Sequence, residues 1–486
     1  MSDSKSVYGR AARPITIGWP MGVSSERTIV RPKRTAAVLI AVALLATAGC
    51  SGRSGSETEN SSSGDKVVAD FGDLTGVCGD GDALGSPTQG VTGSEITAGV
   101  FTDVGYSKNP EFVDAATVFT SWCNAAGGIN GRTITTEIHD SKVMAVRQKM
   151  VEACRTDFAL VGGGAGLDGL GVKERLECTL PDFPAQISQQ PNLGTDLQVI
   201  ASQSTYAHYD PYNASRQWLT KEAYPESAGA IGIINGDSPV TKVLGDKAVE
   251  SLNAMGAKVV YNQLYPVGGV TDWTPYAQAI KNSGVRGLIF IGEDGPLAKL
   301  EEKLTSMDYK LDWIDPTNNA FRPDYIELLG RSASFQNNIV DLGGVVPPQL
   351  ADESPAMQQL QKLYEQYAPD AVISLPAIRA FSAWLLFAKA ASACGSELTR
   401  TCVVETAKKE TEWTGGGLHS PNDLSAKDPA PNCFNVMQAT PEGWKAPEFG
   451  ANEGLFRCGT PPYRYTGDYG EPMTLADVGK TMADVK

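Results

Sequence analysis

Residues 96–138 read ITAGVFTDVGYSKNPEFVDAATVFTSWCNAAGGINGRTITTEI. The opening Ile96–Phe101 predicts a buried strand. Gly127–Gly131 turns the chain, and Thr133–Ile138 predicts a second strand. Between the strands, apolar residues recur three and four positions apart and predict an amphipathic helix: Phe112, Ala115, Ala116, Phe119, Trp122, Cys123 and Ala126. The stretch is therefore a strand–helix–strand unit.

The same alternation continues along the chain. A helix over Val143–Cys154 and a strand over Phe158–Val161 extend the first unit, and this strand ends at a glycine-rich loop. We therefore predict an α/β fold of two doubly wound parallel-sheet lobes, with a ligand cleft between them where loops leave the carboxyl ends of the strands. The second lobe rests on a repeat of the pattern at Ala230–Ile234, Lys242–Met255, Lys258–Leu264, Trp273–Lys281 and Gly287–Ile291.

Two further helices are predicted after the second unit, at Pro355–Tyr367 and Leu375–Cys394. The second is apolar on nearly all sides, so we expect it to be buried in the core, and a membrane span is the alternative. Arg379 and Lys389 argue against a span. From Thr411 onward Gly, Pro and Asn dominate, which predicts a loosely structured tail.

The composition limits the class of protein. At 486 residues the chain is long enough for two or three domains. With 42% hydrophobic and 20% charged residues it is neither a disordered chain nor a protein with many membrane spans. The net charge of −15 argues against a nucleic-acid partner, because phosphate binding requires clustered Lys and Arg. A globular body remains.

The amino-terminal residues have the order of an export signal. Basic residues from Arg27 to Arg34 precede the apolar stretch Ala36–Ala48, which is shorter than the about 20 residues that span a bilayer. Small residues then precede Cys50, and this pattern resembles the lipobox of bacterial lipoprotein signals. We predict a signal peptide over residues 1–49 and a lipidated Cys50 that anchors the protein to the membrane.

The predicted signal leaves two points open. Residues 1–20 are unlike a signal, which favours Met21 as the start of translation. Cleavage near Ala48 without lipidation is the alternative and would release a soluble protein. In the anchored form, residues 50–90 would be a flexible tether and amino-terminal arm, because Ser51–Asp65 is rich in Ser, Gly and Glu.

The cysteines point to an oxidising compartment. If Cys50 carries lipid, eight remain, and an even number in an exported chain predicts four disulfides. Many pairings are compatible with the sequence, and reduced buried cysteines are the alternative. Our working hypothesis has the pairs Cys78–Cys178, Cys123–Cys154, Cys394–Cys402 and Cys433–Cys458.

The sequence does not favour metal, cofactor or enzyme chemistry. No cysteine pair has CxxC spacing and only three His are present, so we expect no metal site. Residues 164–169 match GxGxxG, but no suitable acid follows about 20 residues on, so we expect no dinucleotide cofactor. Gly236–Ser238 is similar to the nucleophile block of a lipase and esterase family. That family also needs an Asp three residues before its catalytic His, which is missing at His139, His208 and His419.

Three segments resemble a known family. They are Gly127–Arg132 (GGINGR), Phe158–Gly163 (FALVGG) and Val270–Trp273 (VTDW), in this order and spacing. They resemble type I periplasmic binding proteins, and more narrowly the leucine/isoleucine/valine-binding branch of ABC-importer receptors, over about residues 90–417. The tail from His419 is less similar. The resemblance implies two lobes joined by three crossovers, which close on a small ligand by hinge bending and then dock on a permease.

The resemblance also implies lobes that are discontinuous in sequence. We place the first lobe at residues 91–207 plus 349–410, and the second at 208–348 plus 411–486, including the disulfide-linked tail. It further implies an extracytoplasmic location, a small-molecule ligand and an ABC permease as partner. We expect a monomer.

Candidate ligand-binding residues of the first lobe follow its strands. The family places Ser or Thr, together with backbone amides, around a ligand carboxylate in the loop after the third strand. Here glycines and an alanine leave only backbone donors in that loop. In the next loop, amide side chains replace the expected small residues, whereas Asp140 is expected to hold a turn. The candidates are Asp103, Tyr106, Gly164, Ala165, Gly166, Gln189 and Gln190.

The second lobe supplies the remaining candidates. The acidic residue that the family places opposite a ligand ammonium is missing near Asn318, and Glu293 stands where the family often has an aromatic residue and can replace it. For acids at strand ends, helix capping is the alternative role. These departures weaken the assignment of a branched-chain amino acid. The candidates are Asp237, Glu293, Asp294, Asn318 and Asn319.

The sequence thus predicts an extracytoplasmic substrate-binding lipoprotein of an ABC importer, and not an enzyme. Its ligand would be a small polar organic solute: amino-acid-like, an amide or an organic acid. A tethered ligand sensor for a signalling partner is the alternative, and the sequence does not separate the two.

Overall fold

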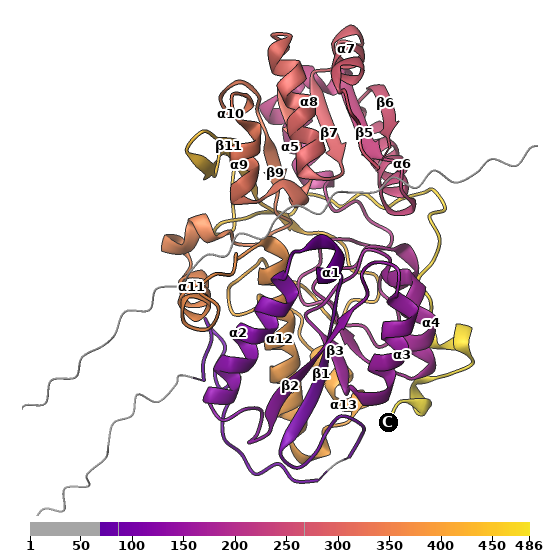
Figure 1. Ribbon diagram of the computed structural model, residues 1–486, viewed down its shortest axis with the longest axis vertical. Coiled ribbons are helices and arrows are strands. Elements are labelled where there is room, and N and C mark those ends of the chain that lie inside the picture. Colours follow the sequence, from indigo (N-terminus) through magenta and orange to yellow (C-terminus); the bar gives the residue numbers. More distant parts are fainter. Residues whose placement is uncertain (1–68, 86, 267) are drawn as a thin grey trace, which may run out of the picture. The chain divides into compact units, whose positions relative to one another are not determined.

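The computed structural model describes residues 69–85, 87–266 and 268–486 (Figure 1). The predicted signal peptide over residues 1–49, the lipidation site Cys50 and the tether Ser51–Asp65 lie outside the described residues.

Four parallel strands form the first sheet, in the order β2-β1-β3-β4. On one face of β1, Ile96, Ala98 and Val100 belong to the same core as α2 and α12. On the other face, Phe101 packs with residues of α3. Apolar side chains on both faces explain why helices cover both sides of the sheet. These elements are β1 (Glu95–Thr102), β2 (Thr133–Asp140), β3 (Ala159–Val161), β4 (Asp182–Phe183), α2 (Glu111–Ala125), α3 (Val146–Thr156) and α12 (Leu375–Cys394).

The second sheet repeats this plan with four parallel strands in the order β6-β5-β7-β8. Ile231, Ile233 and Ile289 form a core with the inner side of α6. Leu288 and Phe290, on the opposite face of β7, pack with α7 and α8. The predicted fold of two doubly wound parallel sheets is confirmed. The elements are β5 (Ile231–Gly236), β6 (Val259–Tyr265), β7 (Gly287–Ile291), β8 (Trp313–Asp315), α6 (Pro239–Ala254), α7 (Thr274–Asn282) and α8 (Asp294–Ser306).

The tail forms more strands than its Gly, Pro and Asn content predicts. β11 (Val436–Thr440) pairs antiparallel with both β9 (Ile339–Asp341) and β12 (Gly443–Lys445). A parallel bridge from Ile314 to Asn338 connects β9 to the second sheet. β10 (Cys433–Phe434) and β13 (Arg457–Cys458) form a separate pair.

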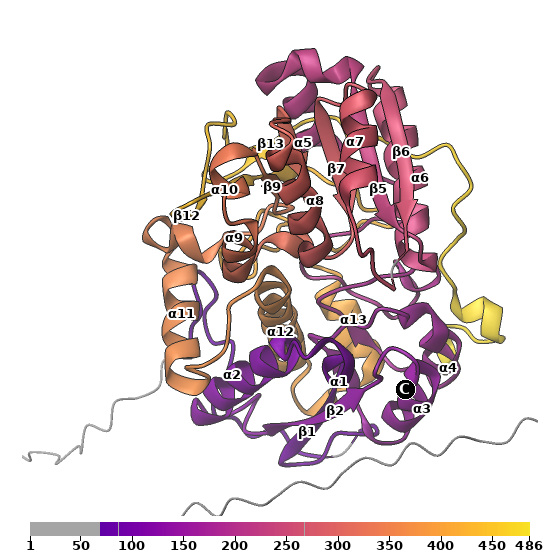
Figure 2. The same cartoon turned by 45° about the horizontal axis from the view of Figure 1, so that its top comes forward.

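The remaining helices complete the two halves (Figures 1 and 2). We call the first sheet with α1–α4 and α11–α13 the first lobe, and the second sheet with α5–α10 and β9–β13 the second lobe. The chain passes between the lobes after β4, after β9 and after α13, as the resemblance implies. These helices are α1 (Val104–Ser107), α4 (Val172–Glu177), α5 (Asn213–Trp218), α9 (Pro323–Leu329), α10 (Ser332–Phe335), α11 (Pro355–Tyr367) and α13 (Arg400–Ala407).

Helix starts follow local chemistry. The hydroxyls of Ser238, Ser354 and Ser374 each accept a hydrogen bond from a first-turn amide of α6, α11 and α12, and a proline lies in the first turn of each helix. α3 begins at Val146, three residues later than predicted, because Lys142 and Val143 have φ of 47° and 68° and cannot belong to a right-handed helix.

The apolar helix α12 is a core helix. Among the described residues, the segment Leu375–Glu397 alone is long and apolar enough to cross a membrane, and 83% of its most apolar window is buried inside the protein. Arg379 within it is 3% exposed, beside the second lobe's Leu342, whose carbonyl accepts its hydrogen bond.

Two of the four predicted disulfides are present in the structure, and the other two are not. Cys394–Cys402 and Cys433–Cys458 are present as predicted. The predicted pairs Cys78–Cys178 and Cys123–Cys154 are wrong, because the structure has Cys78–Cys123 and Cys154–Cys178. The arm lies beside the glycine turn after α2, where Gly79 N donates to Gly128 O at 2.7 Å, and this brings Cys78 to α2. Cys154 of α3 instead bonds to Cys178, which directly follows α4.

The arm and the last residues of the chain both pack on the first lobe. In the arm, Phe71 is fully buried and its ring packs against Phe381 of α12. The last residues were expected in the second lobe, yet Leu475 and Val485 pack against Val172 of α4 in the first lobe. Both segments are held by contacts with residues far away in the sequence.

Candidate functional site

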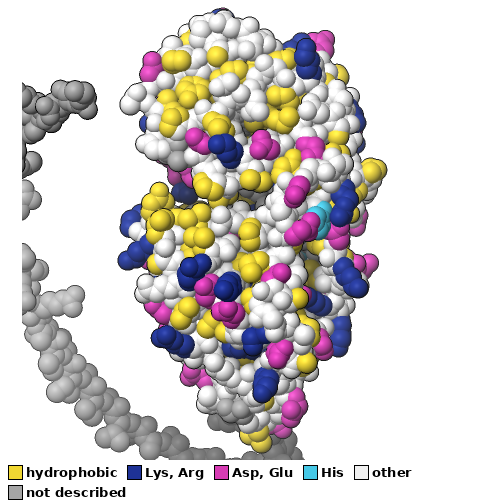
Figure 3. All heavy atoms as spheres, turned by 90° about the vertical axis from the view of Figure 1, so that its right-hand side faces the viewer, with side chains coloured by type: hydrophobic (Ala, Val, Ile, Leu, Met, Phe, Trp, Pro, Cys, Tyr) yellow, Lys and Arg dark blue, Asp and Glu magenta, His cyan; other side chains and the backbone are white. Residues whose placement is uncertain are grey.

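The carboxyl ends of both sheets lie next to a change in strand order. β1 connects onward to β2 on one side and has β3 on the other, and β5 stands in the same way between β6 and β7. Ligands of open α/β sheets bind in the crevice at such points. The predicted residues all follow strands at these ends: β1, β3 and β4 in the first lobe, and β5, β7 and β8 in the second. The surface is indented between the lobes (Figure 3).

Asp103 connects three loops of the first lobe. Its Oδ1 accepts hydrogen bonds from Ser141 Oγ and from Val143 N (2.6 Å), and its Oδ2 accepts one from Gly166 N (2.7 Å). These donors lie in the loops after β2 and β3, whereas Asp103 follows β1. The carboxylate is therefore occupied by the protein itself and positions the loops around it.

The glycine loop after β3 offers few donors to a ligand. Gly164 N donates to Phe101 O at 2.9 Å, and Gly166 N donates to Asp103. Among the described residues, the amide of Ala165 alone of the three has no acceptor, and Ala165 is 6% exposed. A Cβ at Gly163 would lie 2.5 Å from Phe101 O, so the close approach of these two segments requires glycine.

Asp168 lies among the candidate residues of the first lobe, and the sequence prediction did not include it. Its carboxylate accepts hydrogen bonds from Ser188 N (2.9 Å), Gln189 N (2.9 Å) and Asn192 Nδ2 (3.0 Å). Burial raises its pKa to about 6. Asp168 thus occupies the amides of Ser188 and Gln189 in the loop after β4, so these two donors are used within the protein. The GxGxxG stretch contains Asp168, but its spacing gives no sign of these partners.

The two glutamines have different partners. Gln189 Oε1 accepts from Gly169 N at 3.0 Å, so this side chain joins the loops after β3 and β4. Gln190 Nε2 donates to Ala207 O at 3.2 Å, and its Oε1 accepts from Lys247 Nζ at 2.9 Å. Lys247 lies on α6, so this last bond joins the two lobes. Lys247 is 6% exposed, and burial lowers its pKa to about 8.

The candidate residues of the second lobe make fewer hydrogen bonds within the protein than those of the first lobe. The Glu293 carboxylate makes no hydrogen bond or ion pair with another described residue, and burial and the neighbouring Asp294 raise its pKa. Asp294 accepts from Gly295 N at 2.7 Å. Asp237 pairs with Lys242 at 3.2 Å, and both side chains are 55% exposed.

The last two candidates, Asn318 and Asn319, lie in the short turn Asn318–Ala320 after β8. In the described part of the chain, no hydrogen bond joins a first-lobe candidate to a second-lobe candidate.

Apolar side chains lie at the same edge of the first sheet. Tyr106 after β1 is 72% exposed, Met144 after β2 is 81% exposed, and Leu170 after β3 is 46% exposed. The loops that carry them are the ones that Asp103 connects. This edge therefore offers an apolar surface beside few polar donors.

Buried charges gather where the chain passes between the lobes. Arg216 lies 3.5 Å from Asp210 and 3.4 Å from Asp315, at the end of β8. Asp341 ends β9, and its burial raises its pKa to about 7. Nε of Arg216 and Arg379 and Oδ2 of Asp341 have no hydrogen-bond partner among the described residues. The sequence gives no sign of this cluster, because its members come from separate segments.

Two cavities are found among the described residues, and neither spans the carboxyl ends of the strands in both lobes. A small one of about 30 Å³ lies in the first lobe beneath Gly163–Ala165 and is bounded by Phe101, Met150 and Asp168. That volume suits about one water molecule. A larger, open one of about 640 Å³ is bounded by Asp312 and Asn337, which precede β8 and β9, and so lies at the opposite edge of the second lobe.

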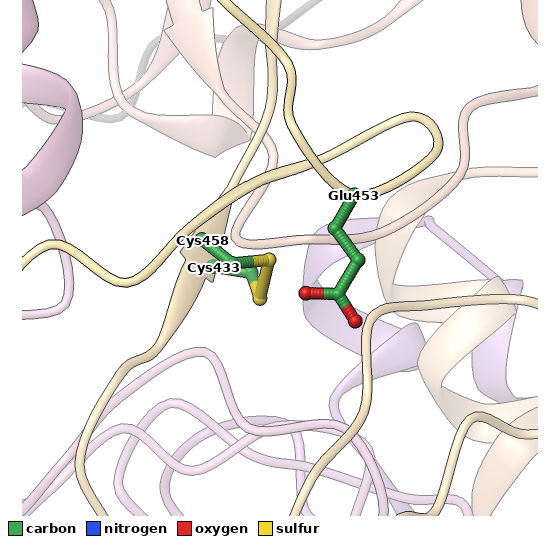
Figure 4. A group of neighbouring side chains, drawn as sticks. All are labelled: Cys433, Glu453 and Cys458. Atoms are coloured by element: carbon green, nitrogen blue, oxygen red, sulfur yellow. A yellow bond between two sulfur atoms is a disulfide. The ribbon is translucent and has the colours of Figure 1, made fainter.

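One group in the described part of the chain has the composition of a metal site: Cys433, Glu453 and Cys458 (Figure 4). The two cysteines form a disulfide, so neither sulfur is a thiolate that could bind a metal. The carboxylate alone makes no metal centre.

Comparison with known proteins identifies the family. A family model described as periplasmic binding protein matches residues 98–444. The chain therefore belongs to the periplasmic binding protein family, and its fold is of type I. The predicted family and fold are confirmed. The family binds solutes, and it implies a small-molecule ligand, an ABC permease as partner and an extracytoplasmic location.

Several solved structures share the fold. A fatty acid ABC transporter substrate-binding protein from Thermomonospora curvata is 17% identical, with a TM-score of 0.62, covering 78% of this chain and 99% of that one. The leucine-binding protein LivK from Thermotoga maritima is 12% identical (TM-score 0.59, 72% and 97%). LivJ from Streptococcus pneumoniae, in complex with isoleucine, is 15% identical (TM-score 0.58, 73% and 98%). The comparison with curated proteins gave no match.

Proposed function

We propose that this protein is the extracytoplasmic substrate-binding lipoprotein of an ABC importer. It captures a small polar organic solute between its lobes, which close around it by hinge bending. The observation that supports this most is the pairing of two parallel sheets, each with polar residues at carboxyl ends next to a change in strand order. Three passages of the chain between the lobes provide the hinge.

The partners of the site residues favour certain solutes. The amides of Ser188 and Gln189, which would suit a ligand carboxylate, donate to Asp168, so an amide or an amino-acid-like solute that uses few of these donors fits better than a simple organic acid. Glu293 is the free acid that can meet an ammonium or amide N–H. Tyr106 and Met144 suit an apolar part of the solute. The similar structures are named for fatty acids, leucine and isoleucine, all of which have an apolar part.

Membrane attachment is part of the proposal. Lipidation of Cys50 would keep the protein close to its permease. Mass spectrometry of the mature amino terminus distinguishes a lipidated Cys50 from a terminus near Ala48. A sensor that passes its closed state to a signalling protein would bind its solute in the same way, and loss of solute uptake on deletion of the gene separates importer from sensor.

A thermal-shift screen of small metabolites tests the proposal. A solute at 100 times its Kd adds about 2.7 kcal/mol to the free energy of unfolding. The best hit should lose at least about tenfold in affinity on Glu293→Ala, which corresponds to about 1.4 kcal/mol. Glu365→Ala, at an exposed acid of α11, is the matched control and should leave the affinity unchanged. Equal affinity of both variants would remove Glu293 from the site, and conversion of the bound solute would indicate an enzyme.

A further inference from the structure

The last 26 residues cross from one lobe to the other. The family match ends at residue 444, and the chain then continues to Lys486. In Figures 1 and 2 the carboxyl terminus lies among the first-lobe helices, whereas the preceding tail runs beside the second lobe. We call residues 461–469 the upper anchor and residues 473–486 the lower anchor. Gly470, Glu471 and Pro472 link them.

The upper anchor is bound to α6 of the second lobe, mainly through Glu250. The Glu250 carboxylate accepts hydrogen bonds from Tyr463 Oη (2.9 Å), Thr466 N (2.6 Å), Gly467 N (3.1 Å) and Tyr469 Oη (2.7 Å). Although burial opposes it, these bonds hold the pKa of Glu250 at about 2. Charged hydrogen bonds of this kind are about twice as strong as neutral ones.

Backbone contacts extend this attachment to the segment before α5. Asp210 N donates to Tyr463 O at 3.0 Å, and Tyr465 N donates to His208 O at 2.8 Å, as in an antiparallel strand pair. Asn213 Nδ2 also donates to Pro461 O at 2.9 Å. The upper anchor is therefore held along most of its length.

The lower anchor is bound to the first lobe. Met473 N donates to Pro191 O at 3.0 Å, and Leu475 N donates to Asp196 Oδ2 at 2.7 Å. Leu475 and Val485 are buried in an apolar cluster with Val172, Leu176 and Leu197. Thr401 Oγ1 donates to Val485 O at 3.0 Å. Pro191 directly follows the candidate residues Gln189 and Gln190, so the anchor is attached to the loop that carries them.

The link between the anchors is short. Three residues separate Tyr469 from Met473, and an extended chain spans at most about 3.5 Å per residue, so these two residues can be at most roughly 14 Å apart. Any motion that carries α6 away from the loop after β4 must stay within this reach while both anchors hold. A second connection lies alongside, because Lys247 donates to Gln190 while its Nζ lies 5.1 and 5.3 Å from the ring centroids of Tyr465 and Tyr469.

We propose that residues 461–486 form a strap that ties the two lobes together on the side of α4 and α6 and limits how far they separate there. The strap adds a fourth passage to the three of the fold. The lobes then open chiefly on the opposite side, and the rings of Tyr465 and Tyr469 hold Lys247 against Gln190.

A change in strap length tests this inference without any ligand. Spin labels on unnatural amino acids at Glu177 of α4 and Asp246 of α6, both exposed, report the separation of the lobes. A Gly/Ser insertion of about 12 residues after Gly470 adds roughly 20 Å of reach and leaves both anchors intact. We expect the distance distribution to widen and to move to longer values. The same insertion after Gly454, an exposed position before the strap, is the control and should leave the distribution unchanged.

A second variant tests the strap independently, in case the protein with the insertion does not fold. Leu475→Ala weakens the lower anchor without lengthening the chain and should widen the distribution in the same direction. Distributions identical to the unmodified protein in both variants would overturn the strap. Because no solute is present, that result would leave the proposed solute binding standing, and failure of every metabolite to bind would leave the strap standing.

Discussion

The carboxyl-terminal edges of the two sheets have the same topology but opposite chemistry. In the first lobe the polar groups are used within the protein: Asp103 and Asp168 each accept three hydrogen bonds, and Gln189 accepts one from Gly169 N. In the second lobe, Glu293 makes no such bond with a described residue, and Asp237 has only an exposed ion pair. The polar groups of the first edge are thus bonded within the protein, beside the exposed Tyr106, Met144 and Leu170. The second edge carries the Glu293 carboxylate, which has no such bond among the described residues.

The largest effect that tests this contrast is expected at Asp168. Asp168→Ala leaves two backbone amides and the Asn192 amide without their acceptor in a buried place, where each lost partner costs about 1–3 kcal/mol. We expect the free energy of unfolding to fall by about 4 kcal/mol in urea titrations. Asp237→Ala is the matched control and should change it by less than about 0.5 kcal/mol. Equal changes in the free energy of unfolding for these two variants would contradict the proposed difference between the two sheet edges.

The dependence of stability on pH is a second test of the buried, hydrogen-bonded state of Asp168. Its pKa in the folded protein is about 6, above the unfolded value, so between about pH 4 and pH 6 the folded state holds a proton that the unfolded state has lost. The stability that this residue contributes is therefore largest below about pH 4 and falls as the pH rises to 6. Relative to Asp168→Asn, the protein should lose about 3 kcal/mol across this range. A constant difference between the two proteins from pH 4 to 7 would contradict the assignment.

Asp103 should have a smaller effect on stability. It is partly exposed, so water can replace some of its hydrogen bonds to Ser141, Val143 and Gly166 when it is removed. We expect Asp103→Ala to cost about 2 kcal/mol and to raise hydrogen exchange in the loops after β2 and β3. Asp140→Ala, which removes the acceptor of Gly105 N and Lys142 N, is the comparison and should leave hydrogen exchange in the loop after β3 unchanged. Faster exchange confined to residues 103–107 would show that Asp103 does not connect the loops.

Glu293 should have the smallest effect on stability. Since its carboxylate has no partner to lose and burial raises its pKa, Glu293→Gln should change the free energy of unfolding by less than about 0.5 kcal/mol, or raise it slightly. The same variant should weaken binding of the best solute from the thermal-shift screen. A large loss of stability would mean that Glu293 is a structural residue like Asp168.

Sequence periodicity predicted the elements of the sheets well. The strand Gly287–Ile291 and the helices Pro355–Tyr367 and Leu375–Cys394 have the predicted bounds, because their apolar pattern, proline and serine signals are local. Contacts between distant residues were not predicted. Cys78 could have paired with any cysteine until the position of the arm beside α2 was known.

The candidate site was predicted less fully for the same reason. Strand ends place the candidates at one edge of each sheet, because that follows from parallel topology. Whether a carboxylate there is free depends on its partners: nothing next to Asp168 in the sequence indicates the amides 20 residues away. The strap did leave a local signal, since Thr474 and Asp477, like Thr481 and Asp484, have the spacing of a capping box and predict the start of a helical turn.

The most direct test of the account is a crystal structure of the protein with the solute that gives the largest thermal shift. We predict that the solute lies between the carboxyl ends of β1 and β3 and those of β5 and β7, with Glu293 within about 3 Å of one of its polar atoms. A solute bound instead in the open cavity beside Asp312 and Asn337, with the strand ends unoccupied, would contradict it.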